Sequence, residues 1–278
     1  MDERDPADFS LSLSELTPED RRHLQMFSSS HVQAVLADRQ AACHQATAEE
    51  YLRHCHTDPG EQHKLHAACF NSTSEFFRDR WTFHLLERTV LPALAARGGA
   101  RIWCAGCAAG QEALSLAIVL DELTAGHARR PTAIFATDLR PEQHARALAG
   151  RYPRSQFRHM TLGRMERWFR PEGDALQVVD ELRSRVQYSI HDLLDETAFC
   201  PPESIYGDFD VISCMNLLLY YNASVQVRLL RNFRRILAAD GLLVVAPSEV
   251  GIVNQSGLFV SHGDGPIFKI APGERCPR

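Results

Sequence analysis

The sequence predicts an α/β protein with a mostly parallel sheet, which follows a small all-helical domain. From residue 100 onward, short apolar runs that are typical of buried strands alternate with segments that have the apolar spacing of helices. This alternation indicates βαβ units, in which helices cover both faces of a parallel sheet. Near the end, two apolar runs within 257–270 flank a polar, glycine-containing connector, which favours an antiparallel hairpin.

The domain boundaries follow from the same patterns. We expect a flexible leader over 1–15, a helical domain over 16–70 and a larger α/β domain over 71–278. Within the larger domain, residues 151–190 are rich in arginine, proline and aromatic side chains and interrupt the alternation of strands and helices. This stretch is therefore interpreted as an inserted β-subdomain.

The individual elements are assigned from apolar spacing and from residues that begin or end helices. Thr17 and Pro18 are a typical cap and first-turn residue for the first helix. In chain order we expect helices over 16–27, 46–56 and 61–70, a strand over 100–105, a helix over 111–123, a strand over 132–138, a helix over 141–150, short strands within 175–182 and 185–190, a strand over 209–216, a glycine-closed helix over 223–241 and a strand over 242–249.

Composition excludes several classes of protein. With 278 residues, of which 45% are hydrophobic and 23% charged, the chain is typical of ordinary globular proteins. Its formal charge of −5 argues against nucleic acid as a partner, and no apolar run is long enough for a membrane span. The acidic, polar start is unlike a secretory signal, and eight cysteines without such a signal favour reduced thiols in the cytoplasm. No sequence feature indicates an oligomeric state.

A glycine-containing loop at 105–110 separates the strand over 100–105 from the next helix. Gly106 and Gly110 let the backbone turn sharply and approach a ligand closely. Their G-x-x-x-G spacing matches neither the dinucleotide fingerprint nor the P-loop. Asp138 ends the following strand, where a carboxylate can accept hydrogen bonds from ribose hydroxyls. On these features alone, a nucleoside cofactor site and a simple turn both remain open.

The charge around this loop favours one class of cofactor. Glu112 lies at the start of the helix that follows, and no lysine or arginine occurs between residues 102 and 128. A pyrophosphate group would need cationic donors, whereas a sulfonium or an ammonium group is stabilised by carboxylates. The loop therefore favours S-adenosylmethionine over NAD or ATP.

Five motifs in order resemble those of the chemotaxis receptor methyltransferase (CheR) family. They are "NSTSEFFRD" at 71–79, "IWCAGCAAGQEALSLA" at 102–117, "ATD" at 136–138, "CMNLLLYY" at 214–221 and "APSE" at 246–249. The resemblance implies a helical domain followed by a Rossmann-like class I methyltransferase domain with a small β-subdomain. It also implies transfer of a methyl group from S-adenosylmethionine, which leaves S-adenosylhomocysteine, to glutamate side chains of chemoreceptor cytoplasmic helices.

The resemblance assigns site residues by position. Arg78 and Tyr220 are expected to act in catalysis by orienting the acceptor carboxylate or the methionine end of the cofactor, and no metal is expected. The residues expected to bind the cofactor are Asn71, Thr73, Arg78, Gly106, Gly110, Glu112, Asp138, Asp192, Leu193, Asn216 and Leu217.

Departures from the family pattern keep two alternatives open. Gln111 stands where the family has an acid, Leu114 where it has an aromatic residue and Met215 where it has an arginine. Residues 31–70 contain few basic side chains, which weakens electrostatic steering toward acidic receptor helices. The alternatives are the same cofactor with a different protein or small-molecule carboxylate, and a non-catalytic cofactor-binding interaction module.

Cysteine and histidine residues suggest two further sites, neither of which is favoured. Cys104 and Cys107 form a CxxC motif, but its strand-and-loop context favours packing over redox chemistry. His63, His66 and Cys69 could share a helical face, with His54 or His56 across the turn, and bind zinc. Exposed histidines on a helix are the commoner explanation, and the spacing matches no standard zinc finger.

Overall fold

The computed structural model describes residues 17–70, 74–124, 132–204 and 207–272. Two compact units are present. One contains the N-terminal helices together with Leu219–Gln226, and the other contains Ser72–Leu218 and the chain from Val227 onward. The predicted cofactor contacts Asn71 and Thr73 lie outside the described residues.

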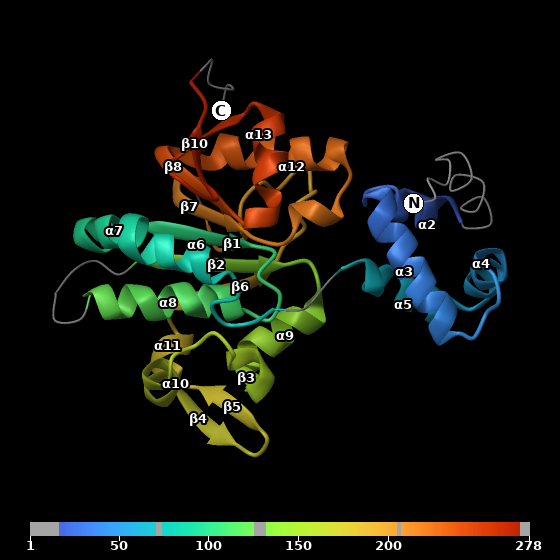
Figure 1. Cartoon of the computed structure of the whole chain (residues 1–278), viewed down its shortest axis with the longest axis horizontal. Coiled ribbons are helices and arrows are strands. Elements are labelled where there is room, and N and C mark those ends of the chain that lie inside the picture. Colours follow the sequence, from blue (N-terminus) through green and yellow to red (C-terminus); the bar gives the residue numbers. More distant parts are fainter. Residues whose placement is uncertain (1–16, 71–73, 125–131, 205–206, 273–278) are drawn as a thin grey trace. The chain divides into compact units, whose positions relative to one another are not determined.

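The N-terminal unit is helical, as the sequence predicts (Figure 1). Thr17 begins the first helix, because its side chain accepts a hydrogen bond from the backbone N–H of Asp20. A capping box between Thr47 and Glu50 begins the third helix. The helices are α2 (Pro18–Leu24), α3 (Ser29–Ala42), α4 (Ala48–Thr57) and α5 (Pro59–Cys69).

Helix α3 is absent from the sequence-based assignment. It buries only Val32, Val35 and Leu36 among its 14 residues, so its apolar stripe is too short to stand out. These side chains complete the core of the unit with Tyr51 and Leu52, both of which are fully buried.

A buried ion pair joins α3 to α5. The carboxylate of Glu61 is 2% exposed and accepts two hydrogen bonds from Nη2 of Arg39, at 2.6 and 2.8 Å. The hydroxyl of Tyr51 donates to the same carboxylate at 3.1 Å. Burial alone would raise the pKa of Glu61, but the hydrogen bonds from Arg39 and its other neighbours hold that pKa below its usual value.

The segment Leu219–Gln226 belongs to the helical unit although it lies far along the chain. The carbonyl of Tyr220 accepts a hydrogen bond from the N–H of Ser28 at 2.8 Å, and the N–H of Asn222 donates to the carbonyl of Met26 at 3.0 Å. The rings of Phe27 and Tyr221 stack with their centroids 5.2 Å apart. These contacts explain why this segment groups with the helices.

The second unit is built on a seven-stranded sheet with the order β6-β2-β1-β7-β8-β10-β9. Strands β6, β2, β1, β7 and β8 are parallel, and β10 is antiparallel to both β8 and β9. The final hairpin is therefore antiparallel, as predicted. The strands are β1 (Arg101–Ala105), β2 (Ala133–Asp138), β6 (Val186–Ile190), β7 (Phe209–Cys214), β8 (Leu237–Val245), β9 (Phe259–Ser261) and β10 (Ile267–Ile270).

Helices cover both faces of this sheet. Four consecutive residues of β1, from Ile102 to Ala105, are buried, which requires packing on both sides of the strand. The α/β fold class that the sequence predicts is therefore confirmed. The helices of this unit are α6 (Arg80–Leu85), α7 (Leu91–Arg97), α8 (Gln111–Thr124), α9 (Pro141–Ala149), α10 (Leu162–Trp168), α11 (Asp180–Arg183), α12 (Ala223–Ile236) and α13 (Val250–Ser256), with a π-helical turn at Leu86–Val90 between α6 and α7.

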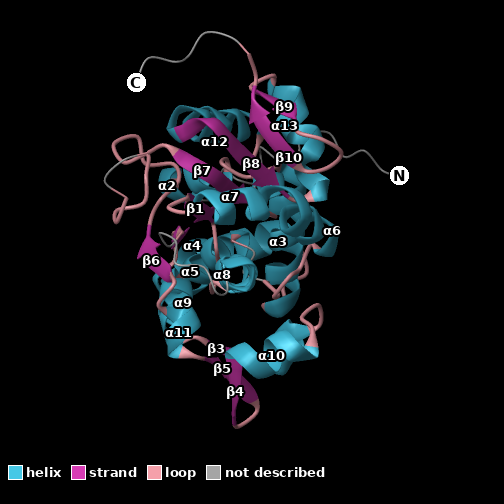
Figure 2. Ribbon diagram, turned by 90° about the vertical axis from the view of Figure 1, so that its left-hand side faces the viewer, coloured by secondary structure: helices cyan, strands magenta, loops and turns pink. Residues whose placement is uncertain are grey.

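A small antiparallel sheet forms the inserted subdomain (Figures 1 and 2). Its order is β3-β5-β4, from β3 (Arg151–Pro153), β4 (Phe169–Glu172) and β5 (Ala175–Val178). Strand β6, expected within this insertion, instead pairs in parallel with β2. It lies at the edge of the large sheet and is only partly buried, and such a pattern does not indicate which sheet the strand joins.

The helix expected over 223–241 is shorter than predicted, because α12 ends at Ile236 and β8 begins at Leu237. The glycine expected to close the helix, Gly241, lies within β8. A Cβ atom there would come within 2.7 Å of the carbonyl oxygen of Phe209, so only glycine allows the two strands to approach this closely. No helix in the described parts of the chain is long and apolar enough to cross a membrane.

Replacing Arg39 with alanine tests the buried ion pair of the helical unit. Loss of the guanidinium leaves Glu61 as a buried charge without its main partner, which costs about 3 kcal/mol. We expect the opening free energy of α3 and α5 amides, measured by hydrogen exchange, to fall by about that amount. Arg53→Ala, at an exposed position on α4, should change it by less than about 0.5 kcal/mol. Equal effects of the two substitutions would show that the ion pair does not hold these helices.

Candidate functional site

Most of the predicted site residues that the structure describes lie just after the carboxyl ends of the parallel strands. Strand β1 has β2 on one side and β7 on the other, so the direction of the strand order reverses at β1. In open α/β sheets, ligands bind outside the carboxyl ends of the strands at such a reversal. The loops that follow β1, β2 and β7 therefore form the candidate site.

The loop after β1 is held by the end of β2. The N–H groups of Gly106 and Cys107 both donate to the carbonyl of Thr137 at 2.9 Å. Gly106, Ala108 and Gly110 have φ angles of +79°, +47° and +89°. Such left-handed residues turn the chain sharply, and for Ala108 the conformation is costly.

Asp138 stabilises this conformation. Its Oδ2 accepts a hydrogen bond from the N–H of Ala108 at 2.9 Å, and its Oδ1 accepts one from the N–H of Arg140 at 3.1 Å. The guanidinium Nε of Arg140 lies 3.4 Å from Oδ1. The loop itself contains no cation, as the sequence indicates, but Arg140, two residues after Asp138 and directly before α9, places one beside its carboxylate. Oδ1 accepts both hydrogen bonds from Arg140, whereas Oδ2 retains a further lone pair for another donor.

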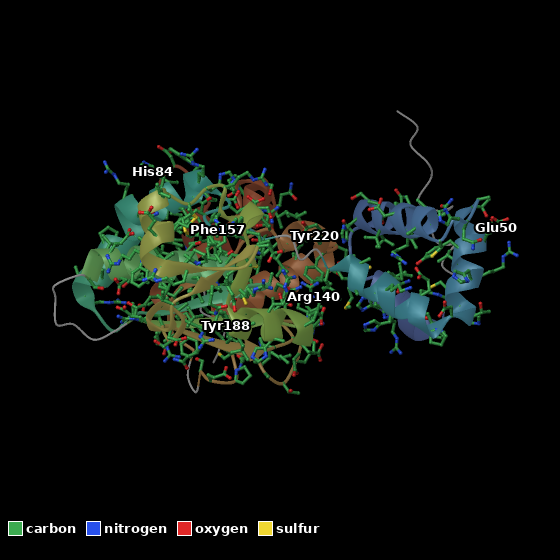
Figure 3. The ribbon with its side chains drawn as sticks, turned by 90° about the horizontal axis from the view of Figure 1, so that it is seen from below. Glu50, His84, Arg140, Phe157, Tyr188 and Tyr220 are labelled. Atoms are coloured by element: carbon green, nitrogen blue, oxygen red, sulfur yellow. The ribbon has the colours of Figure 1, made fainter. Side chains whose placement is uncertain are left out.

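The two glycines of the loop lie against side chains from neighbouring strands. A Cβ atom on Gly106 would come within 3.0 Å of Leu217 Cδ1, and one on Gly110 within 2.8 Å of the Tyr188 ring. The Tyr188 hydroxyl is buried and has no hydrogen-bond partner among the described residues. Tyr188 and Arg140 can be located in Figure 3. Glycine is therefore required at both positions by the backbone conformation and by close packing.

Glu112 lies in the first turn of α8 beside the ends of β1 and β7. The pKa of Glu112 is raised to about 7, chiefly by burial; the negative charges of Asp79 and Glu249 contribute to the rise, whereas a hydrogen bond with the Ser213 hydroxyl opposes it. Ser213 is 1% exposed. A carboxyl group with this pKa can exist in either protonation state at neutral pH.

Glu249 holds the loop after β7, although the sequence analysis did not select it as a site residue. Its fully buried carboxylate accepts hydrogen bonds from the N–H groups of Asn216, Leu217 and Ala246 at 2.9, 2.7 and 2.9 Å. Asn216 has a φ angle of +59°, which this carboxylate stabilises. The signal that could have found Glu249 is the acid of the "APSE" motif, which directly follows strand β8.

The segment before α6 is fixed at two points. The N–H of Phe76 donates to the carbonyl of Gln156 at 3.0 Å, and the N–H of Phe77 donates to Ser115 Oγ at 3.1 Å. Gln111, 1% exposed, donates through its amide nitrogen to Gln156 Oε1 at 2.9 Å. Helix α8 and the inserted subdomain thus hold the backbone that carries Arg78, which is partly buried.

The remaining predicted residues are Asp192, Leu193 and Tyr220. Asp192 is exposed and its Oδ1 accepts a hydrogen bond from the N–H of Leu194 at 2.8 Å, whereas Leu193 is partly buried. Both follow β6 at the same edge of the sheet. The ring of Tyr220 lies 4.7 Å from that of His31 within the helical unit. Its expected catalytic role stays a prediction.

The two alternative sites are not supported by the geometry. Cys104 and Cys107 are buried, and burial raises the pKa of both thiols, which disfavours the reactive thiolate. In the helical unit, His66 Nε2 lies 2.8 Å from Asp20 Oδ1, and the Cys69 thiol donates to the carbonyl of Leu65. Over the described ranges, no group of three or more His, Cys, Asp or Glu side chains is arranged to hold a metal ion.

The site suits a cationic nucleoside cofactor. The carboxyl group of Asp138 lies at the end of β2, and that of Glu112 lies in the first turn of α8, which follows β1. The loop between β1 and α8 contains three residues with left-handed backbone conformation. Buried oxygens on Asp79 and Tyr188 have no hydrogen-bond partner among the described residues, so a ligand could complete them. These features define an α/β domain that binds a nucleoside cofactor of positive charge.

The chain belongs to the CheR methyltransferase family. Residues 72–261 match the family model described as the CheR methyltransferase SAM-binding domain. The chain is therefore an S-adenosylmethionine-dependent methyltransferase, which confirms the cofactor and the family that the sequence predicts.

Relatives at moderate identity carry related names. A chemotaxis protein methyltransferase of Listeria innocua is 30% identical over 205 residues, which cover 73% of this chain and 74% of the relative. Chemotaxis protein methyltransferase 2 of Pseudomonas aeruginosa is 32% identical over 218 residues, covering 77% and 75%. A probable biofilm formation methyltransferase, WspC, of the same organism is 29% identical over 215 residues, covering 76% of this chain and 49% of the relative.

Gly110→Ala tests the packing of the cofactor loop. The left-handed φ alone costs an alanine about 1–2 kcal/mol, and overlap with the Tyr188 ring adds to this. We expect a free energy of unfolding at least about 2 kcal/mol lower in urea denaturation, and binding of S-adenosylhomocysteine weakened about tenfold or more in calorimetry.

Gly163→Ala on α10 is the matched control, because a Cβ atom there meets nothing within 4 Å. It should leave binding unchanged and alter stability by at most about 1 kcal/mol, in the stabilising direction. A Gly110→Ala protein that is as stable as the wild type and binds as tightly would show that the loop does not need glycine there.

Proposed function

We propose that this chain transfers the methyl group of S-adenosylmethionine to glutamate side chains of a chemoreceptor-like protein in the cytoplasm. Two relatives named chemotaxis protein methyltransferase support the acceptor class. The cysteines of the described ranges are free thiols, which supports a reducing compartment. We further propose that residues 71–278 form the methyltransferase domain and that residues 16–70 form a separate helical domain.

The chemistry demands little of the protein. The cofactor, when bound, supplies an electrophilic methyl group on a sulfonium centre. A glutamate side chain has a pKa of about 4.3 in model peptides, so it is already ionised and nucleophilic at neutral pH. Catalysis by this chain therefore consists of binding, orientation and exclusion of water, without a general base.

The acid-rich edge of the sheet makes a cation necessary for this reaction. Asp79, Glu112, Asp138 and Glu249 all lie at or beside the candidate site, so an incoming carboxylate would meet repulsion. Arg78 lies on the fixed segment directly before Asp79, and this is the observation that carries the proposal. We infer that Arg78 orients the acceptor carboxylate or the methionine carboxylate, and that Asn216, Leu217, Asp192 and Leu193 line the adenosine side.

A second acceptor is favoured by the charge of the helical unit. Residues 17–70 contain five arginine or lysine residues against seven aspartate or glutamate residues, and one of the cations, Arg39, is committed to Glu61. Electrostatic attraction of this unit for an acidic receptor helix is therefore weak. A different protein carboxylate, or a small carboxylic acid, is the second candidate for the same chemistry.

Arg78→Ala tests the role assigned to this side chain. We expect turnover of a glutamate-bearing chemoreceptor cytoplasmic fragment to fall about 100-fold or more, with an unchanged circular dichroism spectrum, because one cation that opposes the local negative charge is lost. Arg80→Ala, at an exposed position two residues later, should retain wild-type turnover. Unchanged kinetics in Arg78→Ala would remove this residue from the site.

The chemical nature of the product tests the acceptor class. Radiolabelled methyl groups transferred to glutamate should be released as volatile methanol in mild base, because glutamyl methyl esters hydrolyse under these conditions. Label that survives base treatment would show a nitrogen or thioether product, and would contradict a carboxylate acceptor.

A further inference from the structure

The carboxyl group of Asp79 lacks hydrogen-bond donors that the fold usually supplies to a buried acid. Asp79 precedes α6, at the position where such a residue usually caps the helix, yet its side chain makes no capping hydrogen bond. Its Oδ2 atom is buried and has no hydrogen-bond partner among the described residues. A buried carboxylate oxygen without a donor is costly, and it is often retained where a ligand completes it.

The carboxyl groups of Asp79 and Glu112 interact electrostatically within the site. The charge of Asp79 raises the pKa of Glu112, as does that of Glu249, while the Ser213 hydroxyl and the Cys104 thiol favour the ionised form. Burial raises the pKa of Asp79 itself, and the neighbouring Arg78 and His159 side chains oppose that shift. These groups belong to β1, β7, α8, the turn after β8, the loop before α6 and the inserted subdomain.

The methionine end of the cofactor has the chemistry that this arrangement can receive. It carries an ammonium and a carboxylate on the same carbon atom. Arg78 and Asp79 are consecutive residues of opposite charge on a backbone fixed by Gln156 and Ser115. If the methionine carboxylate of the cofactor lies beside Arg78, its ammonium group lies toward the carboxyl groups of Asp79 and Glu112. An ammonium group offers the donors that the unpartnered oxygens lack.

We propose that Asp79 is a further cofactor-binding residue, which receives the ammonium group of S-adenosylmethionine together with Glu112, and that binding displaces one proton from this acidic pair to solvent. The protonated Glu112 loses its proton as the ammonium group arrives, so one positive charge leaves the pair and one enters it. The proposal concerns the cofactor alone and does not depend on the identity of the acceptor.

The exchange makes cofactor affinity depend on pH. Glu112 has a pKa of about 7 in the free protein, so it is mostly protonated at pH 6 and mostly ionised at pH 8. The ammonium group binds the ionised form, and each bound ligand must therefore release a proton at pH 6 but almost none at pH 8. Affinity at pH 6 is expected to be about tenfold lower than at pH 8.

Calorimetric titration of the full chain with S-adenosylhomocysteine, which keeps the ammonium group, tests the exchange. Titrations at pH 6, 7 and 8 in phosphate and in imidazole buffer, whose ionisation enthalpies differ, give the number of protons released. We expect close to one proton at pH 6 and close to none at pH 8 for the wild type. Tight binding without proton release at pH 6 would overturn the proposal while leaving the methyltransferase function untouched.

Asp79→Asn tests the part assigned to this residue. Removing its charge lowers the pKa of Glu112, so proton release at pH 6 should fall, and affinity at pH 8 should drop about tenfold or more because one carboxylate is lost. Glu75→Gln, on the same segment but paired with Arg158, should behave as the wild type. An Asp79→Asn protein with unchanged proton release, whether or not its affinity falls, would contradict the role of Asp79 in the pair.

Discussion

Carboxylates that accept backbone N–H groups hold the loops at the functional edge of the sheet. Asp138 binds the N–H of Ala108, and Glu249 binds those of Asn216 and Leu217. Both loops contain a non-glycine residue with positive φ, which costs free energy without such support. The positions of the cofactor loop and of the loop after β7 therefore depend on negative charges built into the fold.

This structural use of acids also determines which chemistry the site can perform. An edge that already contains Glu112, Asp138 and Glu249 attracts cations and repels anions, so it suits a cofactor with a sulfonium and an ammonium group better than one with phosphates. The same field opposes a carboxylate acceptor. In the proposed reaction, the positive charges of the cofactor and of Arg78 offset this field, so the proposed acceptor class depends on this arginine.

The sequence predicts the fold class and the cofactor loop because both depend on local patterns. Apolar runs of β1 and β2, the glycines at 106 and 110 and the acid at the end of β2 are visible without tertiary information. The predictions that fail depend on long-range pairing. Strand β6 joins β2 across the insertion, and Asp79 meets Glu112 only in the folded chain. Spacing along the chain contains none of these contacts.

The central claim is that the carboxyl edge of the parallel sheet binds the cofactor. Hydrogen–deuterium exchange of the full chain with and without saturating S-adenosylhomocysteine tests it most directly. With the ligand bound, we expect added protection from exchange in peptides that cover 74–79, 105–112, 138–140 and 214–217. These peptides contain the strand ends, the fixed segment before α6 and the loops after β1 and β7. Saturation without protection at 105–112 and 138–140, or with protection confined to the helices of 17–70, would contradict it.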